Sequence, residues 1–155
     1  MTAMKFRIPA ALQLEHAELH DRLVKATKEP GAVGEAAREV ARLLHPHFVR
    51  EEQFALPPLA LLAPLARREF DPAMADVLPM TQRLRTELPA MLREHRRIVA
   101  ALALLRETAR IASLAEYESF ARALIQHAET EEQVLYPAAI LVGEEVARLL
   151  EKETM

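Results

Sequence analysis

Two stretches of the chain repeat one pattern of residues that can ligate metals. Residues 47–58 read HFVREEQFALPP and residues 127–138 read HAETEEQVLYPA, so that in each a histidine precedes a glutamate by four positions and a proline by ten. Because residues four apart lie on one face of a helix, each copy presents an imidazole and a carboxylate together. These groups bind first-row transition metals, and they also form buried ion pairs.

The elements that carry both stretches are predicted to be helices. The chain has 155 residues, of which 51% are apolar, 5% are aromatic and only three are glycine, and this composition favours helices around an aliphatic core. Prolines and glycines delimit four segments, 10–28, 34–56, 81–109 and 113–136, followed by a short C-terminal helix over 138–151. SLAE at 113–116 is typical of a capping box, and Pro137 is expected to end the fourth helix. No Gly/Ser-rich linker divides the chain, which predicts a single all-α domain over residues 1–155.

Each of the four segments carries one histidine within an apolar stripe of three- and four-residue spacing, and two of them add a glutamate one turn later. These six residues are His16, His47, Glu51, His95, His127 and Glu131. In the fourth segment the stripe continues to Val134. The first two histidines are equally far from the turn at Pro30 and Gly31, and the other two are equally far from Ile111. If the two hairpins pack together, all six residues meet at one level of the interior.

A buried layer of six ionisable groups needs compensation, because an unpaired buried carboxylate is strongly unfavourable. Four imidazoles and two carboxylates that can bridge suit two first-row metal ions, most naturally iron. The alternative is an ion-paired polar layer without a metal. The sequence favours the metal centre, since six such groups gather at one level.

The dipeptides Glu15-His16 and Glu94-His95, together with HFxxEExxxxP at 47–57, resemble the hemerythrin-like (HHE) cation-binding domain family. The resemblance extends over nearly the whole chain. It implies an up-and-down antiparallel four-helix bundle with a short extra C-terminal helix and a non-haem centre of two oxo- or hydroxo-bridged iron ions. Carried over to this chain, it assigns two histidines to each iron and the two glutamates as bridges: His16 and His47 to one iron, His95 and His127 to the other, and Glu51 and Glu131 between them.

The chain departs from the oxygen-carrying hemerythrins at one ligand. Those proteins have a further histidine one turn along the third helix, where this sequence has Val99. His20, four residues after His16, is a candidate seventh ligand; its alternative role is a residue at the edge of the stripe that hydrogen-bonds a carboxylate. His45 is expected at the surface. Glu52 and Glu132 are turned away from the stripes, so they are expected behind the ligands or at the surface.

Three functional classes remain open for such a bundle. The first binds or senses dioxygen or nitric oxide, the second is a diiron oxidase, peroxidase or iron-handling protein for storage or detoxification, and the third uses its metal only for structure or binds a partner. Bundles that activate oxygen are rich in carboxylates and use Glu-x-x-His pairs, whereas this chain has His-x-x-x-Glu and mainly imidazoles. The sequence therefore favours reversible binding or sensing over enzymatic turnover. A sensor of this kind would need a separate partner protein.

Composition argues against several other classes. A formal charge of -3 and an isoelectric point near 6.1 do not fit a nucleic-acid-binding protein. No stretch has the apolar length of a membrane span and the first residues do not read as a secretory signal, so we expect a cytoplasmic protein that does not bind membranes. The chain contains no cysteine, which excludes disulfides and thiolate metal ligands.

Overall fold

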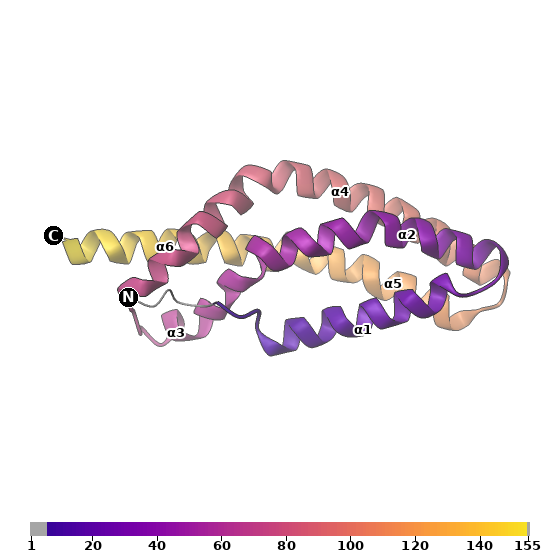
Figure 1. The fold of residues 1–155 in the computed structure, drawn as a ribbon, viewed down its shortest axis with the longest axis horizontal. Coiled ribbons are helices and arrows are strands. Elements are labelled where there is room, and N and C mark those ends of the chain that lie inside the picture. The colour runs from indigo at the N-terminus through magenta and orange to yellow at the C-terminus, as the bar shows by residue number, and fades with distance from the viewer. Residues whose placement is uncertain (1–5, 155) are drawn as a thin grey trace.

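The computed structural model describes residues 6–154, and within this range every regular element is helical (Figure 1). Four long helices are α1 (Ala10–Thr27), α2 (Gly31–Arg50), α4 (Leu78–Ile111) and α5 (Ala115–Thr130). The π-helix η4 (Glu131–Leu135) follows α5 and leads into α6 (Tyr136–Thr154). Between α2 and α4 lie the π-helix η1 (Glu51–Ala55), the 3₁₀-helix η2 (Pro57–Leu61), α3 (Leu62–Ala66) and the 3₁₀-helix η3 (Pro72–Val77). The predicted all-helical class is confirmed for the described residues.

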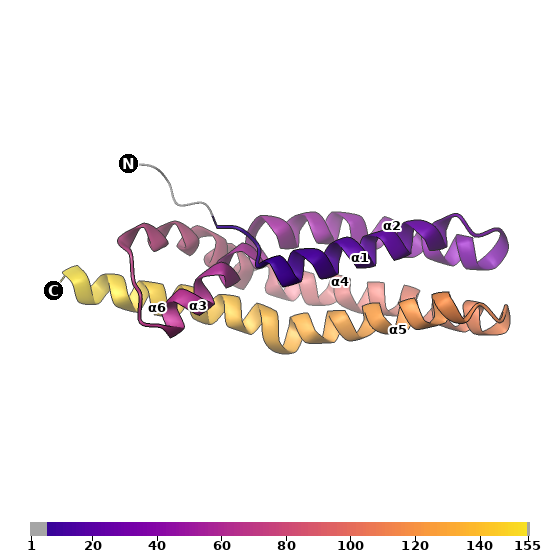
Figure 2. The ribbon, with the colours of Figure 1, turned by 90° about the horizontal axis from the view of Figure 1, so that it is seen from below.

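The four long helices surround a common interior. Helix α1 contacts α2 and α5, and α4 contacts the same two helices. Figures 1 and 2 show the α1–α2 and α4–α5 turns at one end, while the connection from α2 to α4 and the free end of α6 lie at the other. Helix α4 bends along its length in Figure 1, and Pro89 lies inside it, where it removes a helical hydrogen-bond donor.

The turn between α4 and α5 does not use the predicted capping box. The residue that caps α5 is Leu114, and no side chain hydrogen-bonds to the first turn of this helix. Ser113 instead adopts a positive φ of 59° and turns the chain between the two helices. A positive φ of 75° also occurs at Gly31, where α2 begins, and glycine adopts it without the clash that a Cβ atom would cause.

The prediction that Pro137 ends the fourth helix and a short helix follows is wrong. The helical chain continues through η4 into α6, which is 19 residues long. Pro137, which lacks an N–H, lies at the junction where the π-helix η4 changes into the α-helix α6. In the other copy of the motif Pro57 is followed by Pro58. The α conformation is unfavourable for a residue that precedes a proline, so the chain leaves the α-helix there.

Two apolar clusters lie along the bundle, with the predicted polar layer between them. The cluster nearer the two tight turns contains Leu19, Leu44, Leu102 and Leu124. The cluster on the other side contains Phe54, Leu84, Met91 and Tyr136. Along each helix the predicted histidine lies between residues of these two clusters, so burial of the polar layer follows from the packing on both sides.

Helix α6 packs closely against α4 beyond the polar layer. A Cβ atom placed on Gly143 would lie 2.1 Å from Thr81 Oγ1, so the two helices leave no room for a side chain at that position. Val77, Val142 and Val146 form a further apolar cluster beside this contact. Within residues 6–154, no helix combines the length and the apolar character needed to cross a bilayer.

Candidate metal centre

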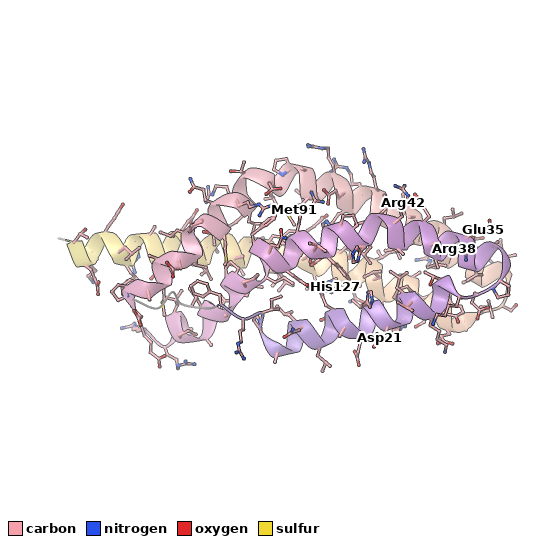
Figure 3. All side chains as sticks on the ribbon, viewed as in Figure 1. Asp21, Glu35, Arg38, Arg42, Met91 and His127 are labelled. Atoms are coloured by element: carbon pink, nitrogen blue, oxygen red, sulfur yellow. The ribbon has the colours of Figure 1, made fainter. Side chains whose placement is uncertain are left out.

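Six of the seven predicted site residues meet in the interior of the bundle. All six are at most 5% exposed: His16, His47, Glu51, His95, His127 and Glu131. In the view of Figure 3 the label of His127 lies between the ribbons of α1 and α2, and the side chain itself is 5% exposed. Equal distance from the turns therefore predicted correctly that the six residues share one level.

The six residues form two groups of four that could each hold a metal ion. One group comprises His16, His127 and both glutamates, and the other comprises His47, His95 and the same two glutamates. The Nε2 atoms of His16 and His127 lie 3.2 Å apart, and those of His47 and His95 lie 2.8 Å apart. The histidines thus pair between the two hairpins, α1 with α5 and α2 with α4, and not within each hairpin as the resemblance implied. Equal height does not decide which neighbour a side chain faces, because that depends on how each helix is rotated about its axis.

Each carboxylate belongs to both groups because its two oxygens point in different directions. Glu51 Oε1 lies 2.5 Å from His47 Nε2, and its Oε2 lies 3.6 Å from His16 Nε2. Glu131 Oε1 lies 3.4 Å from His95 Nε2, and its Oε2 lies 3.4 Å from His127 Nε2. This arrangement has the form that two bridging carboxylates would need.

Four further carboxylates lie behind the four imidazole rings, each facing the Nδ1 atom of a histidine on a neighbouring helix. They are Glu94 at 2.8 Å from His47, Glu132 at 2.9 Å from His95, Glu15 at 2.5 Å from His127, and Glu52 at 3.8 Å from His16. The contacts run once around the bundle, from α1 to α5, α4, α2 and back to α1. Carboxylates in this position orient metal-binding histidines and select their tautomer.

The sequence contains a signal for all four outer carboxylates, but the prediction covered only two of them. Glu52 and Glu132 are the second glutamates of the repeated EE pair; they are exposed and also lie behind the histidines, so both expectations for them hold. Glu15 and Glu94 precede histidines in the repeated EH dipeptide, which marked the family resemblance without a role for the glutamate. Which histidine each of them reaches depends on the neighbouring helix.

Three of the outer carboxylates determine which nitrogen of their histidine ring faces the interior. An ionised carboxylate only accepts hydrogen bonds, so the Nδ1 atoms of His47, His95 and His127 carry the hydrogen. A neutral ring then presents an unprotonated Nε2, and two such atoms face each other across 2.8 Å between His47 and His95. Their lone pairs repel unless a cation lies between or beside them. That cation is either a proton or a metal ion.

The pKa values of the cluster show that it retains protons when no metal is bound. Burial alone would lower the pKa of His95, but the contacts with Glu131 and Glu51 outweigh it and raise the pKa to about 10. At His127, burial is likewise outweighed by Glu131 and Glu15, and the pKa rises to about 9. Burial and the charge of Glu131 raise the pKa of Glu51. A metal ion would bind in place of these protons.

Both glutamates that the two groups share, Glu51 and Glu131, begin a π-helix. In η4 the Tyr136 N–H donates to the Glu131 carbonyl, five residues back, and in η1 the Leu56 N–H reaches the Glu51 carbonyl at 2.9 Å. The predicted core position Val134 is wrong: it is 55% exposed and Tyr136 is buried instead, whereas Phe54, at the matching position in η1, is 1% exposed. Single π-turns inside helices are frequent at functional sites.

Tyr136 is a further residue of the site that the sequence prediction missed. Its hydroxyl oxygen lies 3.3 Å from His47 Nε2 and 3.2 Å from His95 Nε2, and its side chain is fully buried. Burial and the charges of Glu51 and Glu131 raise the pKa of its phenol far above the ordinary value. The available signal was a difference between the two motif copies, since Leu56 occupies the matching position in the first.

His20 is the predicted ligand that the structure does not bring into either group. It is exposed, and it lines a surface pocket of about 350 Å³ together with His16, Glu52, Gln13 and His45. His45 is exposed, as predicted. The pocket reaches His16, whose ring stacks on Phe48 with 4.3 Å between the centroids. The group of His16 and His127 thus borders the surface.

The hydrogen-bonding state of the cluster fits a metal centre. Glu51 Oε2, Glu131 Oε2 and His16 Nδ1 are buried without a hydrogen-bond partner, and Glu51 Oε1 would gain one only if His47 Nε2, 2.5 Å away, carried a proton. Such atoms are rare in native proteins, and each calls for an explanation. A cation within each group would compensate the carboxylate oxygens and accept the lone pairs of the Nε2 atoms. The donor set, with four imidazoles and two carboxylates, suits first-row transition metal ions, of which iron is one.

No match to this chain was found among models of protein families, curated proteins or solved structures. Its function is therefore inferred from the geometry and chemistry of the buried cluster.

Proposed function

We propose that this chain is a hemerythrin-like protein, an up-and-down antiparallel four-helix bundle that holds two iron ions and binds or senses dioxygen or nitric oxide. The observation that carries the proposal is the sharing of Glu51 and Glu131 by two groups of buried imidazoles, one carboxylate oxygen to each group. A single tetrahedral ion would not need donors arranged in two groups. A purely ion-paired layer would leave Glu51 Oε2 and Glu131 Oε2 buried without hydrogen bonds.

The assignment of residues follows the two groups. One ion would be held by His16 and His127, the other by His47 and His95, and both by the two glutamates. The outer carboxylates would keep the rings in the tautomer that binds metal. Iron fits this donor set, since it accepts imidazole and carboxylate ligands together.

The ligand chemistry favours binding over oxidation. Neutral imidazoles stabilise ferrous iron, whereas the diiron bundles that oxidise substrates use more carboxylates and paired Glu-x-x-His motifs. When bound, the two ions would supply electrons that a diatomic ligand needs for tight, reversible binding. The pocket beside His16 offers such a ligand a route from the surface.

Metal analysis and optical spectroscopy test this proposal together. Protein purified from iron-replete cells should contain close to two iron ions per chain, and its reduced form should change colour on exposure to air or nitric oxide and recover when the gas is removed. Protein that holds a single zinc ion, or no metal, contradicts the diiron centre. Irreversible oxidation with steady consumption of hydrogen peroxide would favour the oxidase or peroxidase alternative.

A further inference from the structure

The two halves of the buried cluster differ in one donor. Beside His47 and His95 lies the Tyr136 hydroxyl, at 3.3 and 3.2 Å from their Nε2 atoms. Leu56 matches Tyr136 in the first copy of the motif and has no oxygen to offer. The group of His16 and His127 instead has the ring of Phe48 stacked on His16.

The spacing of these three atoms is that of adjacent ligands around one ion. With bonds of about 2.0–2.1 Å, neighbouring donors lie about 2.9 Å apart in an octahedron and about 3.4 Å apart in a tetrahedron. The three separations here are 2.8 Å between the two imidazoles and 3.2 and 3.3 Å to the phenol oxygen. The phenol oxygen and the two nitrogens therefore form a triangular face in which every atom carries a lone pair.

We propose that Tyr136 is a ligand of the ion held by His47 and His95, so that the two metal positions are chemically different. This inference rests on the proposed function, because it requires bound iron. On binding, the phenol O–H bond breaks, an oxygen–iron bond forms, and the proton is released to water. The His47 ion then has five protein donors, while the ion of His16 and His127 has four.

The unequal donor sets determine where a small ligand binds. The pocket reached from the surface is lined by His16 itself. A second, apolar pocket of about 310 Å³ touches Tyr136 and Glu132, but it is lined by none of the six central residues. The ion of His16 and His127 therefore has both a free coordination position and an open route from the surface. Tyr136 fills a coordination position of the ion of His47 and His95.

The phenolate ligand has a direct spectroscopic signature. Ferric iron bound to a phenolate absorbs visible light by charge transfer, and excitation into that band enhances the ring vibrations of the bound tyrosine. Protein loaded with ferric iron should show these vibrations, and they should shift when the protein is grown with ring-deuterated tyrosine. Because this measurement uses the unaltered chain, it does not depend on the folding of a variant.

Tyr136→Phe should abolish the phenolate vibrations while iron remains close to two per chain. The matched control is Tyr117→Phe, which removes the chain's only other tyrosine; its hydroxyl donates to Glu29 at 2.9 Å, outside the cluster. Two iron ions without phenolate vibrations in the unaltered protein, or with vibrations that survive Tyr136→Phe, would overturn the ligand assignment and leave the proposed function standing. A chain that binds no iron would overturn both.

Discussion

The Nε2 atoms of His47 and His95 lie 2.8 Å apart in the interior of the bundle, although the Nδ1 atom of each ring is already hydrogen-bonded to a carboxylate. Glu94 holds the first ring and Glu132 the second. Two neutral rings held in this way would direct lone pairs at each other, so the pair needs a cation. The state of the cluster is therefore linked both to pH and to metal binding, and this linkage leads to the first prediction.

Metal-free protein should become less stable as the pH rises from 6.5 to 9. The pKa of His95 is raised from 6.5 to about 10 and that of His127 to about 9, so the folded chain retains protons that the unfolded chain releases. Their contribution to the free energy of unfolding is complete below pH 6.5 and is lost as the pH passes 9 and 10. Urea unfolding of chelator-treated protein across this range measures the effect, and His127→Gln should make the dependence shallower. A midpoint that rises with pH would contradict the linkage.

Loss of a shared carboxylate should remove at least one iron ion per chain. Glu131→Ala takes away one oxygen from each group, whereas the apolar clusters on both sides of the layer stay intact. Metal analysis should therefore show a loss while the far-ultraviolet circular dichroism still reports a helical protein. Glu129→Gln, at an exposed position two residues earlier, is the control and should retain all iron. The same loss is expected for Glu51→Ala, and full retention in either variant would remove that residue from the ligand set.

Replacement of an outer carboxylate should weaken metal binding without abolishing it. Glu94→Gln keeps the size of the side chain but removes the charge that holds His47 Nδ1, and it also removes an ion pair with Arg50. Such changes lower metal affinity about 10–100-fold. Competition with a chelator measures the affinity, and Glu87→Gln on the same helix, whose partner is the exposed Arg83, should have no effect. Equal affinities in the two variants would show that Glu94 does not support the site.

His20 should be dispensable for iron, unlike its neighbour on α1. His20 is exposed and lies outside both groups, whereas His16 is buried 3.2 Å from His127. We expect His20→Ala to bind as much iron as the unaltered protein and His16→Ala to lose at least one ion. Iron loss in His20→Ala, with a changed optical spectrum, would restore the seven-ligand set that the spacing of the two histidines predicts.

Gly143→Ala should destabilise the packing of α6 on α4. The added Cβ atom would lie 2.1 Å from Thr81 Oγ1, so one of the helices must shift. Overpacking of this kind costs about 1–3 kcal/mol in the free energy of unfolding. Chemical unfolding measures the loss, and Thr81→Ala in the same chain should recover part of it by removing the nearest atom. Glu151→Ala, exposed near the end of α6, is the control.

The local pattern of the sequence identified the six histidines and glutamates that belong to the buried layer. Helical periodicity relates positions only a few residues apart, so His47 with Glu51, and His127 with Glu131, could be assigned to one face of each helix. Distance from the turns placed the four histidines at one level. Both conclusions concern a single helix or a single hairpin, where the geometry is nearly the same in every protein.

Only the tertiary structure decided which of these residues meet. The rotation of each helix about its axis depends on packing against distant parts of the chain, and it pairs His16 with His127 across two hairpins. The same packing leaves His20 at the surface. After the π-turn that begins at Glu131, Val134 is exposed and Tyr136 lies in the cluster, whereas Phe54, the counterpart of Val134 in the other π-turn, is buried. Helical periodicity cannot predict these contacts and exposures, because they depend on packing between separate helices and not on the spacing within one helix.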